Sequence, residues 1–364
     1  MKPKPLWLKW IFCLFPTFIS LAMYFLLPFF QKFTEFVITR GLFRIVAFPL
    51  EWLMSFIPFS FTEAVVVLSI PAILGLIIIF VIRIIKSSEK LYTIERGCRF
   101  TAWCLSLALL IFMVMDGANF SRIPLSELLK LPNGTYTAQD LYTATCDIAK
   151  KANKARESLE EDQNGCSVLT VSIPELLSLA DDCYDNLKED YPFLITGVTR
   201  VKSAKLSRLW SYTGYTGVYC PWLAEASVNT DIPVFEIGHT AAHEIAHTMG
   251  FAKENECNFI AWLACSTSGQ ADYVYSGHLS AYVYCSNALY DADKELWKKS
   301  RVFCSEGMIR DLKYSISYWK QFEGEIKESS QKFNDSFIKV NGDESGVLSY
   351  DQMVELILRY YDKK

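Results

Sequence analysis

Three residues with the spacing of a zinc-binding helix carry the most recognisable chemistry in this sequence. His243, Glu244 and His247 form an HExxH motif, in which the two histidines are four residues apart. On a helix this spacing places both imidazoles on one face, where they can bind a single Zn²⁺ ion. Glu244 can then take a proton from a zinc-activated water and pass it to a leaving amine. The chain has only 4 histidines, and the presence of three of them within residues 239–247 favours a metal site over a chance match.

A catalytic zinc site needs a third protein ligand, and the sequence offers two carboxylates shortly after the motif. Gly250 is expected to end the HExxH helix, and a second helix is expected to begin at Glu254. Catalytic zinc takes three protein ligands, and two histidines with one glutamate are a common set. Glu254 and Glu256 are both candidates. His239 is expected to pack beside the site or to support a ligand, because histidines spaced by four residues drift around a helix by about 40° per step.

The stretch from Glu254 to Asn258 resembles the ExxA(D/N) pattern of the glutamate zincins, with Cys257 where an alanine is usual. The resemblance implies that Glu254 is the third zinc ligand. It also implies that Asn258, on the same helix face, orients a ligand histidine. Glu256 stays the alternative ligand. The metzincin pattern would instead place its third ligand at Lys253, and we exclude that class because a protonated lysine cannot bind zinc.

Peptide hydrolysis also requires a donor that stabilises the oxyanion of the tetrahedral intermediate. A later helical stretch contains Tyr275, His278 and Tyr282, each of which is a candidate for this role. The alternative is that these residues form an aromatic stripe in the core. Zincins place a sheet edge before the metal-binding helix, so residues 217–229 are expected to form one that pairs with an extended substrate.

The first 120 residues are expected to form a membrane region with three spanning helices. Mean hydropathy is +0.16 and 51% of the residues are hydrophobic, with the excess concentrated in this part of the chain. About 20 apolar residues cross the hydrocarbon core of a bilayer. Residues 36–62 are apolar but interrupted by charges and prolines, so we expect an interfacial segment there. The three predicted spans are approximately residues 10–30, 64–85 and 99–117.

The distribution of basic residues predicts the orientation of these spans. The N-terminal flank and the loop between the second and third spans carry eight Lys and Arg residues, against three in the loop between the first and second. By the positive-inside rule, the N-terminus lies in the cytoplasm and the chain after residue 120 is extracytoplasmic. The net charge of −4 and the pI of about 5.7 argue against a nucleic-acid binder, which is normally basic.

Beyond residue 120 the composition is that of a soluble domain. Capping signals at Thr137 and Ser172 predict two helices, residues 194–229 predict short strands, and the rest is helical in pattern. We therefore expect a mostly α protein, with a membrane region at residues 1–120. An α+β zincin-like metallopeptidase domain with a helical C-terminal part is expected at residues 121–364. The cysteines of this domain permit disulfides in an exported protein, although their scatter also fits buried thiols.

The chain as a whole resembles DUF3810, a family of bacterial membrane proteins that join N-terminal spans to a zincin-like domain. The resemblance implies a location in the bacterial cell membrane and a metallopeptidase fold. We predict a membrane-anchored zinc metallopeptidase that hydrolyses a peptide or protein substrate. The alternative is a catalytically silent zincin-like sensor or binding protein, and the intact Glu244 favours the enzyme. The stretches that carry the resemblance are residues 243–252, 254–265, 275–277 and 346–350.

Overall fold

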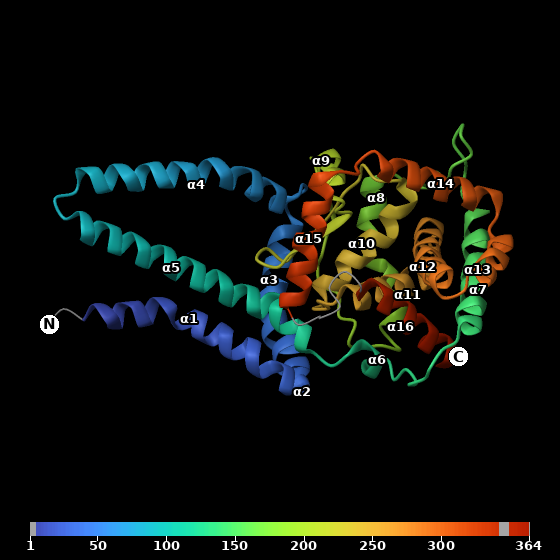
Figure 1. Ribbon diagram of the computed structural model, residues 1–364, viewed down its shortest axis with the longest axis horizontal. Coiled ribbons are helices and arrows are strands. Elements are labelled where there is room, and N and C mark those ends of the chain that lie inside the picture. The colour runs from blue at the N-terminus through green and yellow to red at the C-terminus, as the bar shows by residue number, and fades with distance from the viewer. Residues whose placement is uncertain (1–4, 342–348, 364) are drawn as a thin grey trace.

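Three long apolar helices extend from one end of a helical domain in the computed structural model, which describes residues 5–341 and 349–363 (Figure 1). Each of the three is long and apolar enough to cross a bilayer, as expected of a membrane protein. Helices α1 and α5 pack together, and the Thr17 hydroxyl donates a 2.7 Å hydrogen bond to Ser106 between them. The candidate spans are Leu6–Phe29 (α1, Leu6–Leu26, with the 3-10 turn η1, Leu27–Phe29), Phe61–Lys86 (α4) and Lys90–Met115 (α5).

The third candidate span is longer than the predicted residues 99–117. Helix α5 begins at Lys90, two turns before Arg99. Within the helix Arg99 pairs with Glu95, one turn earlier, at 2.5 Å. This pairing lowers the cost of placing both charges near the membrane. The prediction therefore underestimates the length of this helix, because it takes Arg99 as the N-terminal boundary.

The segment between the first two spans forms helices that lie across the ends of the spans (Figure 1). One side is buried against the rest of the protein, including Phe43, Ala47 and Glu51. The other side exposes large apolar residues such as Phe48 and Trp52. The predicted interfacial segment is thus amphipathic, and the domain covers its buried side. Its elements are α2 (Gln31–Phe33), the π-helical η2 (Thr34–Phe43) and α3 (Arg44–Ser55).

Reciprocal helix caps join the second span to the domain. Glu225 accepts hydrogen bonds from the N–H groups of residues 61 and 62, at the N-terminus of α4. Glu63 in turn accepts hydrogen bonds from the N–H groups of Lys205 and Leu206, at 2.7 and 2.8 Å. A carboxylate is favourable at a helix N-terminus because it satisfies unpaired N–H groups and the helix dipole. Lys202 also forms a buried ion pair with Glu225.

The domain is built from helices packed around α10, α11 and α12. Helix α10 packs against both of the others, and α12 also packs against α7. The predicted N-cap at Thr137 is confirmed and forms a full capping box with Asp140, and Ser172 caps its helix by accepting from the Glu175 N–H. The helices are α6 (Leu125–Leu128), α7 (Ala138–Arg156), α8 (Ile173–Ser178), α9 (Ser207–Thr213), α10 (Val234–Thr248), α11 (Glu254–Thr267), α12 (Ala271–Ala292), α13 (Lys294–Ser300), α14 (Glu306–Lys320), α15 (Glu325–Val340) and α16 (Ser349–Lys363), with 3-10 turns η3 (Gly117–Ser121), η4 (Asp182–Leu187) and η5 (Arg301–Phe303).

A small sheet lies beside α10, where short strands were expected. Its strands are β1 (Lys202–Ser203), β2 (Gly217–Cys220) and β3 (Glu225–Val228), in the order β1-β3-β2. β1 pairs with β3 in parallel, and β2 pairs with β3 antiparallel. β2 is therefore an edge strand. The prediction of a mostly helical protein with some strand in the domain is confirmed.

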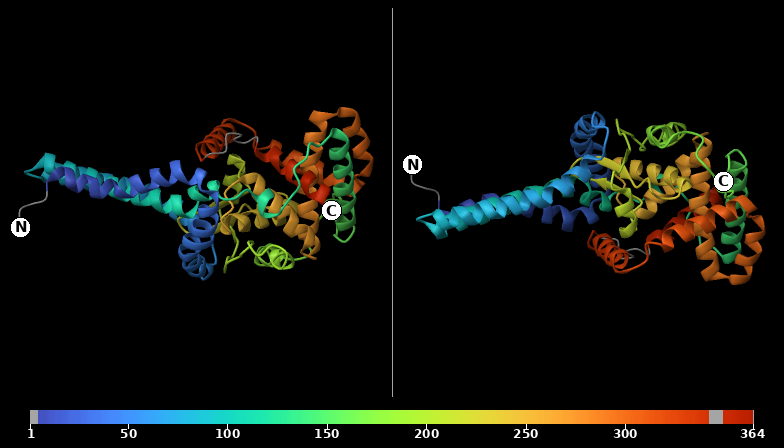
Figure 2. Two further views of the ribbon diagram at one scale, coloured as in Figure 1. Left: turned by 90° about the horizontal axis from the view of Figure 1, so that it is seen from below. Right: turned by 90° about the horizontal axis from the view of Figure 1, so that it is seen from above.

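The helical spans all lie on the same side of the domain. Figure 2 shows this in both of its views. The N-terminal end of α1 and the connection from α4 to α5 lie together at the far end (Figure 1). The start of α1 and residues 83–99, where α4 ends and α5 begins, therefore lie at the end opposite the domain. All eleven cysteines are free thiols.

Candidate metal centre

Helix α10 presents His243 and His247 on one face near its C-terminal end. Their Nε2 atoms lie 3.1 Å apart. The opposite side of the helix is packed tightly through small residues, and Ala241, Ala242 and Ala246 are fully buried. Gly250 adopts a positive φ of 78°, which a glycine takes without strain. The helix therefore ends directly after the second histidine, and the chain turns back over the two rings.

Helix α11 brings a carboxylate to these two rings. Glu254 Oε2 lies 3.1 Å from Nε2 of His243, and Oε1 lies 3.8 Å from Nε2 of His247. One ligand atom from each of the three residues can be chosen so that all lie within 4.8 Å of one another. Two ligands bound tetrahedrally to zinc at about 2.0–2.1 Å are separated by about 3.4 Å. The residues present thus fit a zinc ion in both donor type and spacing.

Hydrogen bonds on the far side of each ring set its orientation. His243 Nδ1 lies 2.9 Å from Oδ1 of Asn258, and His247 Nδ1 lies 2.8 Å from the carbonyl oxygen of Phe251. Both acceptors call for a proton on Nδ1, which leaves the lone pair of Nε2 to bind a metal. The Cys257 thiol lies beneath His247, with Sγ 3.4 Å from Nδ1. The space beneath His247 is therefore filled by a small side chain.

The alternative ligands considered from the sequence are used elsewhere. Glu256 is buried and accepts a 2.8 Å hydrogen bond from the N–H of Leu125, so its carboxylate is directed to the start of α6. His239 Nε2 lies 3.3 Å from the carbonyl oxygen of Asn258. Burial lowers the pKa of His239 to about 3, which keeps the ring neutral. The structure therefore places Glu254, rather than Glu256 or His239, with the two histidines.

Glu244 lies in a buried position between α10 and the edge strand. Its Oε2 has no hydrogen-bond partner in residues 5–341 and 349–363. Burial raises the pKa of Glu244 to about 8. A Cβ atom at Gly217 would lie only 2.2 Å from Oε1 of Glu244, so the glycine in β2 makes room for this carboxylate. The Glu244 carboxylate thus packs against the sheet, while its Oε2 stays free of hydrogen bonds from the described residues.

Burial lowers the pKa of both histidines, whereas the neighbouring carboxylate of Glu254 raises it. Burial lowers the pKa of His247 to about 4, so this ring is neutral at pH 7 and available as a ligand. Burial also disfavours the charged form of His243, but the hydrogen bond and charge of Glu254 outweigh it and raise the pKa. In the absence of a metal, the carboxylate is therefore paired mainly with His243.

Two further residues near the centre could not be identified from the sequence. The ring of Tyr219, in β2, stacks on that of His247, with centroids 6.0 Å apart and an interplanar angle of 13°. The Tyr219 hydroxyl is buried and has no hydrogen-bond partner among the described residues. Asp116 directly follows α5, and burial together with the charge of Glu254 raises its pKa to about 7. Both residues are distant from the HExxH motif in the sequence and are brought near it by the fold, so no local sequence pattern identifies them.

The segment between α1 and α4 contacts the C-terminal end of α10. Glu35 of η2 forms a buried, two-pronged ion pair with Arg122, through Nε and a terminal nitrogen, both at 2.9 Å. The other terminal nitrogen of Arg122 donates a 2.9 Å hydrogen bond to the carbonyl oxygen of Gly250. The guanidinium also lies over the ring of Phe251, 3.9 Å from its centroid. Because Phe251 in turn accepts the bond from His247, Glu35 is linked to a candidate metal ligand through three contacts.

A family model described as a protein of unknown function, DUF3810, matches residues 39–358. The chain belongs to the DUF3810 family. The matched region includes the whole candidate centre, as well as α3, α4 and α5. Comparison with curated proteins and with solved structures gives no match. Of the stretches that suggested DUF3810, residues 346–350 lie largely outside the described residues.

In this DUF3810 chain, the residues proposed from the sequence as oxyanion donors have other partners. The Tyr275 hydroxyl donates a 2.6 Å hydrogen bond to Asp311, which also pairs with Arg156 at 2.7 Å. His278 Nδ1 accepts a 3.3 Å hydrogen bond from the indole of Trp262. Tyr282 contacts the thiol of Cys304 at 3.0 Å. These are core contacts, as the packing alternative for the aromatic stripe predicted.

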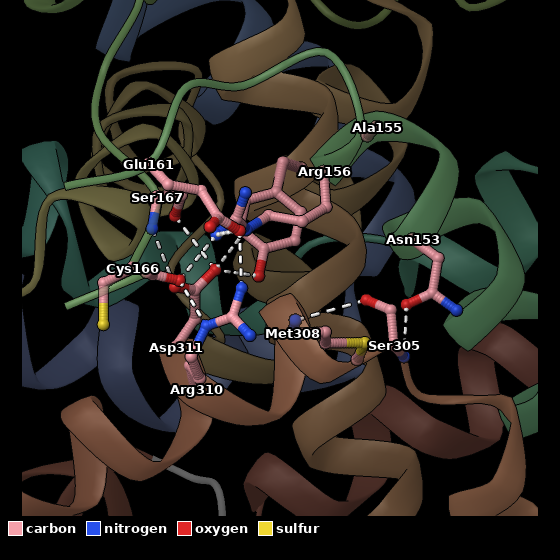
Figure 3. Close-up of polar contacts among 12 residues, drawn as sticks. Asn153, Ala155, Arg156, Glu161, Cys166, Ser167, Ser305, Met308, Arg310 and Asp311 are labelled. Carbon is pink, nitrogen blue, oxygen red and sulfur yellow. Dashed lines mark hydrogen bonds and ion pairs between the residues drawn. The ribbon is translucent and has the colours of Figure 1, made fainter. Parts of the chain in front are cut away.

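The partner of Tyr275 belongs to a polar cluster between α7, α14 and the loop after α7. Figure 3 shows Asp311 and Arg156 among Glu161, Ser167 and Arg310. Asp311 also accepts a 2.8 Å hydrogen bond from the N–H of Ser167. Asp311 is fully buried and its charge is compensated by these donors, so the cluster fixes α14 and the loop to α7.

Proposed function

We propose that this DUF3810 protein is a membrane-anchored zinc peptidase of the glutamate-zincin type, in which His243, His247 and Glu254 bind Zn²⁺. The observation that supports it most directly is the convergence of these three side chains to within 4.8 Å. The hydrogen bonds that direct both Nε2 atoms toward Glu254 add to this support. Two histidines and one glutamate form a ligand set of catalytic zinc sites, which leave one position open.

The proposed reaction assigns a role to each polar group around the centre. When bound, Zn²⁺ supplies a Lewis acid that lowers the pKa of a water in the open position to about 7. The positive charge of a bound ion would favour the ionised form of Glu244, which would then take a proton from the water and deliver it to the leaving amine. Its unpartnered Oε2 is suited to this role. The Tyr219 hydroxyl donates a hydrogen bond to the oxyanion of the tetrahedral intermediate. In this role it replaces Tyr275, His278 and Tyr282.

The edge strand β2 offers a place for an extended peptide. In an antiparallel pair, alternate residues direct their main-chain groups toward the partner strand and away from it. The 2.8 Å hydrogen bond from Asn229 N–H to the Thr216 carbonyl shows that residues 216 and 218 face β3. Gly217 and Tyr219 therefore direct their main-chain groups away from β3, beside Glu244 and His247. A peptide paired with these groups would lie along the candidate centre.

The proposed location is the bacterial cell membrane, with several spans and an extracytoplasmic domain. The end of the molecule opposite the domain carries the start of α1 and the basic residues of positions 83–99, where α4 ends and α5 begins (Figure 1). Basic residues of short loops are retained in the cytoplasm. This arrangement supports a cytoplasmic far end, and with it a domain on the outer side that acts on peptides or proteins there.

The test of the proposed function is peptide hydrolysis by the full chain purified in detergent with zinc. Fluorescein-labelled casein serves as a general probe, and hydrolysis is expected from the natural chain but not from Glu244→Gln. Glu295→Gln, an exposed position on α13, is the matched control and should keep full activity. If zinc binds but the natural chain and Glu244→Gln are equally inactive on casein and on a peptide library, the silent sensor or binding protein is the better assignment.

A further inference from the structure

Helix α15 carries a narrow apolar stripe that the domain does not cover. Four large apolar side chains on this helix are between 37% and 70% exposed, namely Ile326, Phe333, Phe337 and Val340. At about 100° per residue, these four positions fall within an arc of about 60°. A contiguous exposed apolar stripe on a helix is unfavourable in water, and it commonly marks a binding surface.

The rest of the helix surface is divided between the domain and water. Ile338 is buried against the domain. Glu328, Lys332, Asp335 and Lys339 project from a third side, where Lys339 pairs with Asp335 at 2.7 Å. The surface of α15 that the domain leaves uncovered thus has two faces, one apolar and one charged. Helices with one apolar and one charged face typically lie in the interface of a bilayer.

The position of α15 relative to the candidate spans identifies the partner of the stripe. The Tyr24 hydroxyl, in α1, donates a 2.7 Å hydrogen bond to the carbonyl oxygen of Val340. Phe337 packs edge-on against Phe112 of α5, with ring centroids 6.1 Å apart. The apolar stripe therefore continues directly into the surface of the candidate membrane spans.

The direction of α15 fits a helix that lies in the membrane plane. In Figure 1 it runs across the direction of the long helices, at the point where they enter the domain. Figure 2 shows α15 (red) and the segment of residues 31–55 (blue) on opposite sides of this junction. That segment exposes Phe48 and Trp52, so exposed apolar residues are present on both sides of the junction.

We propose that α15 is an interfacial helix whose stripe of Ile326, Phe333, Phe337 and Val340 is buried among the phospholipids of the leaflet next to the domain. Together with α3, it contacts the bilayer on two sides of the spans and so fixes the tilt of the domain on the membrane. Trp222 supports the same placement, because its indole donates a 3.1 Å hydrogen bond to the carbonyl oxygen of Ala108 within α5. The proposal does not depend on the metal centre.

Photocrosslinking to lipid tests this proposal in the full chain. A diazirine-bearing phenylalanine analogue replaces Ile326 or Phe333 on the stripe, or Glu328 or Lys332 on the charged side, one position at a time. Each protein is reconstituted into vesicles of phosphatidylethanolamine and phosphatidylglycerol, irradiated and analysed by mass spectrometry. Leu76, an exposed residue within the α4 span, gives the yield of a lipid-facing position.

We expect phospholipid adducts at positions 326 and 333 in yields close to that at position 76, and several-fold above those at 328 and 332. Equal adduct yields on the two sides of α15 would overturn the proposal. Crosslinks from positions 326 and 333 to a second copy of the chain, in place of lipid, would also overturn it. All five replaced residues are exposed, so the substitutions do not disturb the packing of the domain.

Discussion

Asn258 and His243 are joined by a 2.9 Å contact between Oδ1 and Nδ1, on the side of the ring away from the metal centre. Glu254, one turn earlier on α11, contacts Nε2 of the same imidazole at 3.1 Å. One face of α11 therefore contacts both nitrogens of a single histidine. The ring is fixed in rotation as well as in position, which prepares Nε2 to bind a metal before one is present.

Replacement of Asn258 should weaken zinc binding without removing a ligand. We expect Asn258→Leu to lower the zinc affinity about 10- to 100-fold, because the ring of His243 loses the acceptor that orients it. Asn258→Asp keeps an oxygen at this place and should retain most of the affinity. Chelator competition with the full chain measures the effect. Asn255→Ala, in the same helix turn, is the control, and an unchanged affinity in Asn258→Leu would show that the contact does not orient the ligand.

Tyr219→Phe separates transition-state stabilisation from packing. The phenylalanine keeps the ring that stacks on His247 but lacks the hydroxyl. We expect kcat for casein hydrolysis to fall about 10²- to 10³-fold with little change in zinc affinity, as for the loss of one oxyanion donor. Tyr282→Phe should leave kcat unchanged. If instead the two variants have equal activity, the hydroxyl of Tyr219 has no part in the reaction.

Glu35→Gln tests the link between the segment that joins α1 to α4 and the C-terminal end of α10. The variant leaves Arg122 buried without its carboxylate, and removal of one member of a buried pair costs about 3–5 kcal/mol. We therefore expect a lower thermal unfolding midpoint in detergent and a lower zinc affinity, because Arg122 also holds Gly250 and Phe251. Glu295→Gln breaks an exposed pair and is the control. A variant with the midpoint and zinc affinity of the natural chain would contradict this account.

Glu51 should make the stability of the protein depend on pH. Burial raises the pKa of Glu51 to about 7 from 4.5, against the opposing charge of Arg44, while Asp181 acts in the direction of burial. The folded state therefore favours the protonated carboxyl, and this contribution to stability is lost as the pH rises from 4.5 through 7.

The replacement Glu51→Gln removes this titration. Relative to the natural chain, the variant should be more stable at pH 8, by up to about 3 kcal/mol, and equally stable below pH 4.5. Unfolding midpoints of both proteins across this pH range measure the difference. A constant difference between the two proteins at every pH would show that Glu51 does not change its charge in the folded protein.

The sequence was sufficient to predict those residues of the candidate centre that lie one turn apart on a single helix. His243 and His247 are one helical turn apart, and so are Glu254 and Asn258, so a single-helix argument places each pair on one face. The three long apolar helices were recognisable for a similar reason, because about 20 consecutive apolar residues are the length that a bilayer requires. Span boundaries were less accurate where a charged residue such as Arg99 is paired within its own helix.

The remaining contacts of the centre depend on chain segments that are distant in sequence. Glu35 and Arg122 are 87 residues apart, and no spacing rule connects them. Tyr219 reaches His247 only because a small sheet lies beside α10. Tyr275, by contrast, was a candidate oxyanion donor in the sequence, but its hydroxyl donates a hydrogen bond to the buried carboxylate of Asp311. Which polar residues meet at a site is thus decided by tertiary packing.

The most direct test of the central claim is the zinc content of the purified full chain, residues 34–55 included because they contact the end of α10. After dialysis against trace zinc and removal of excess, elemental analysis should find one zinc per folded chain, and close to none in His247→Ala with the same circular dichroism spectrum. Folded natural chain without bound zinc, or equal zinc in His247→Ala, would contradict the assignment of His243, His247 and Glu254 as a metal centre.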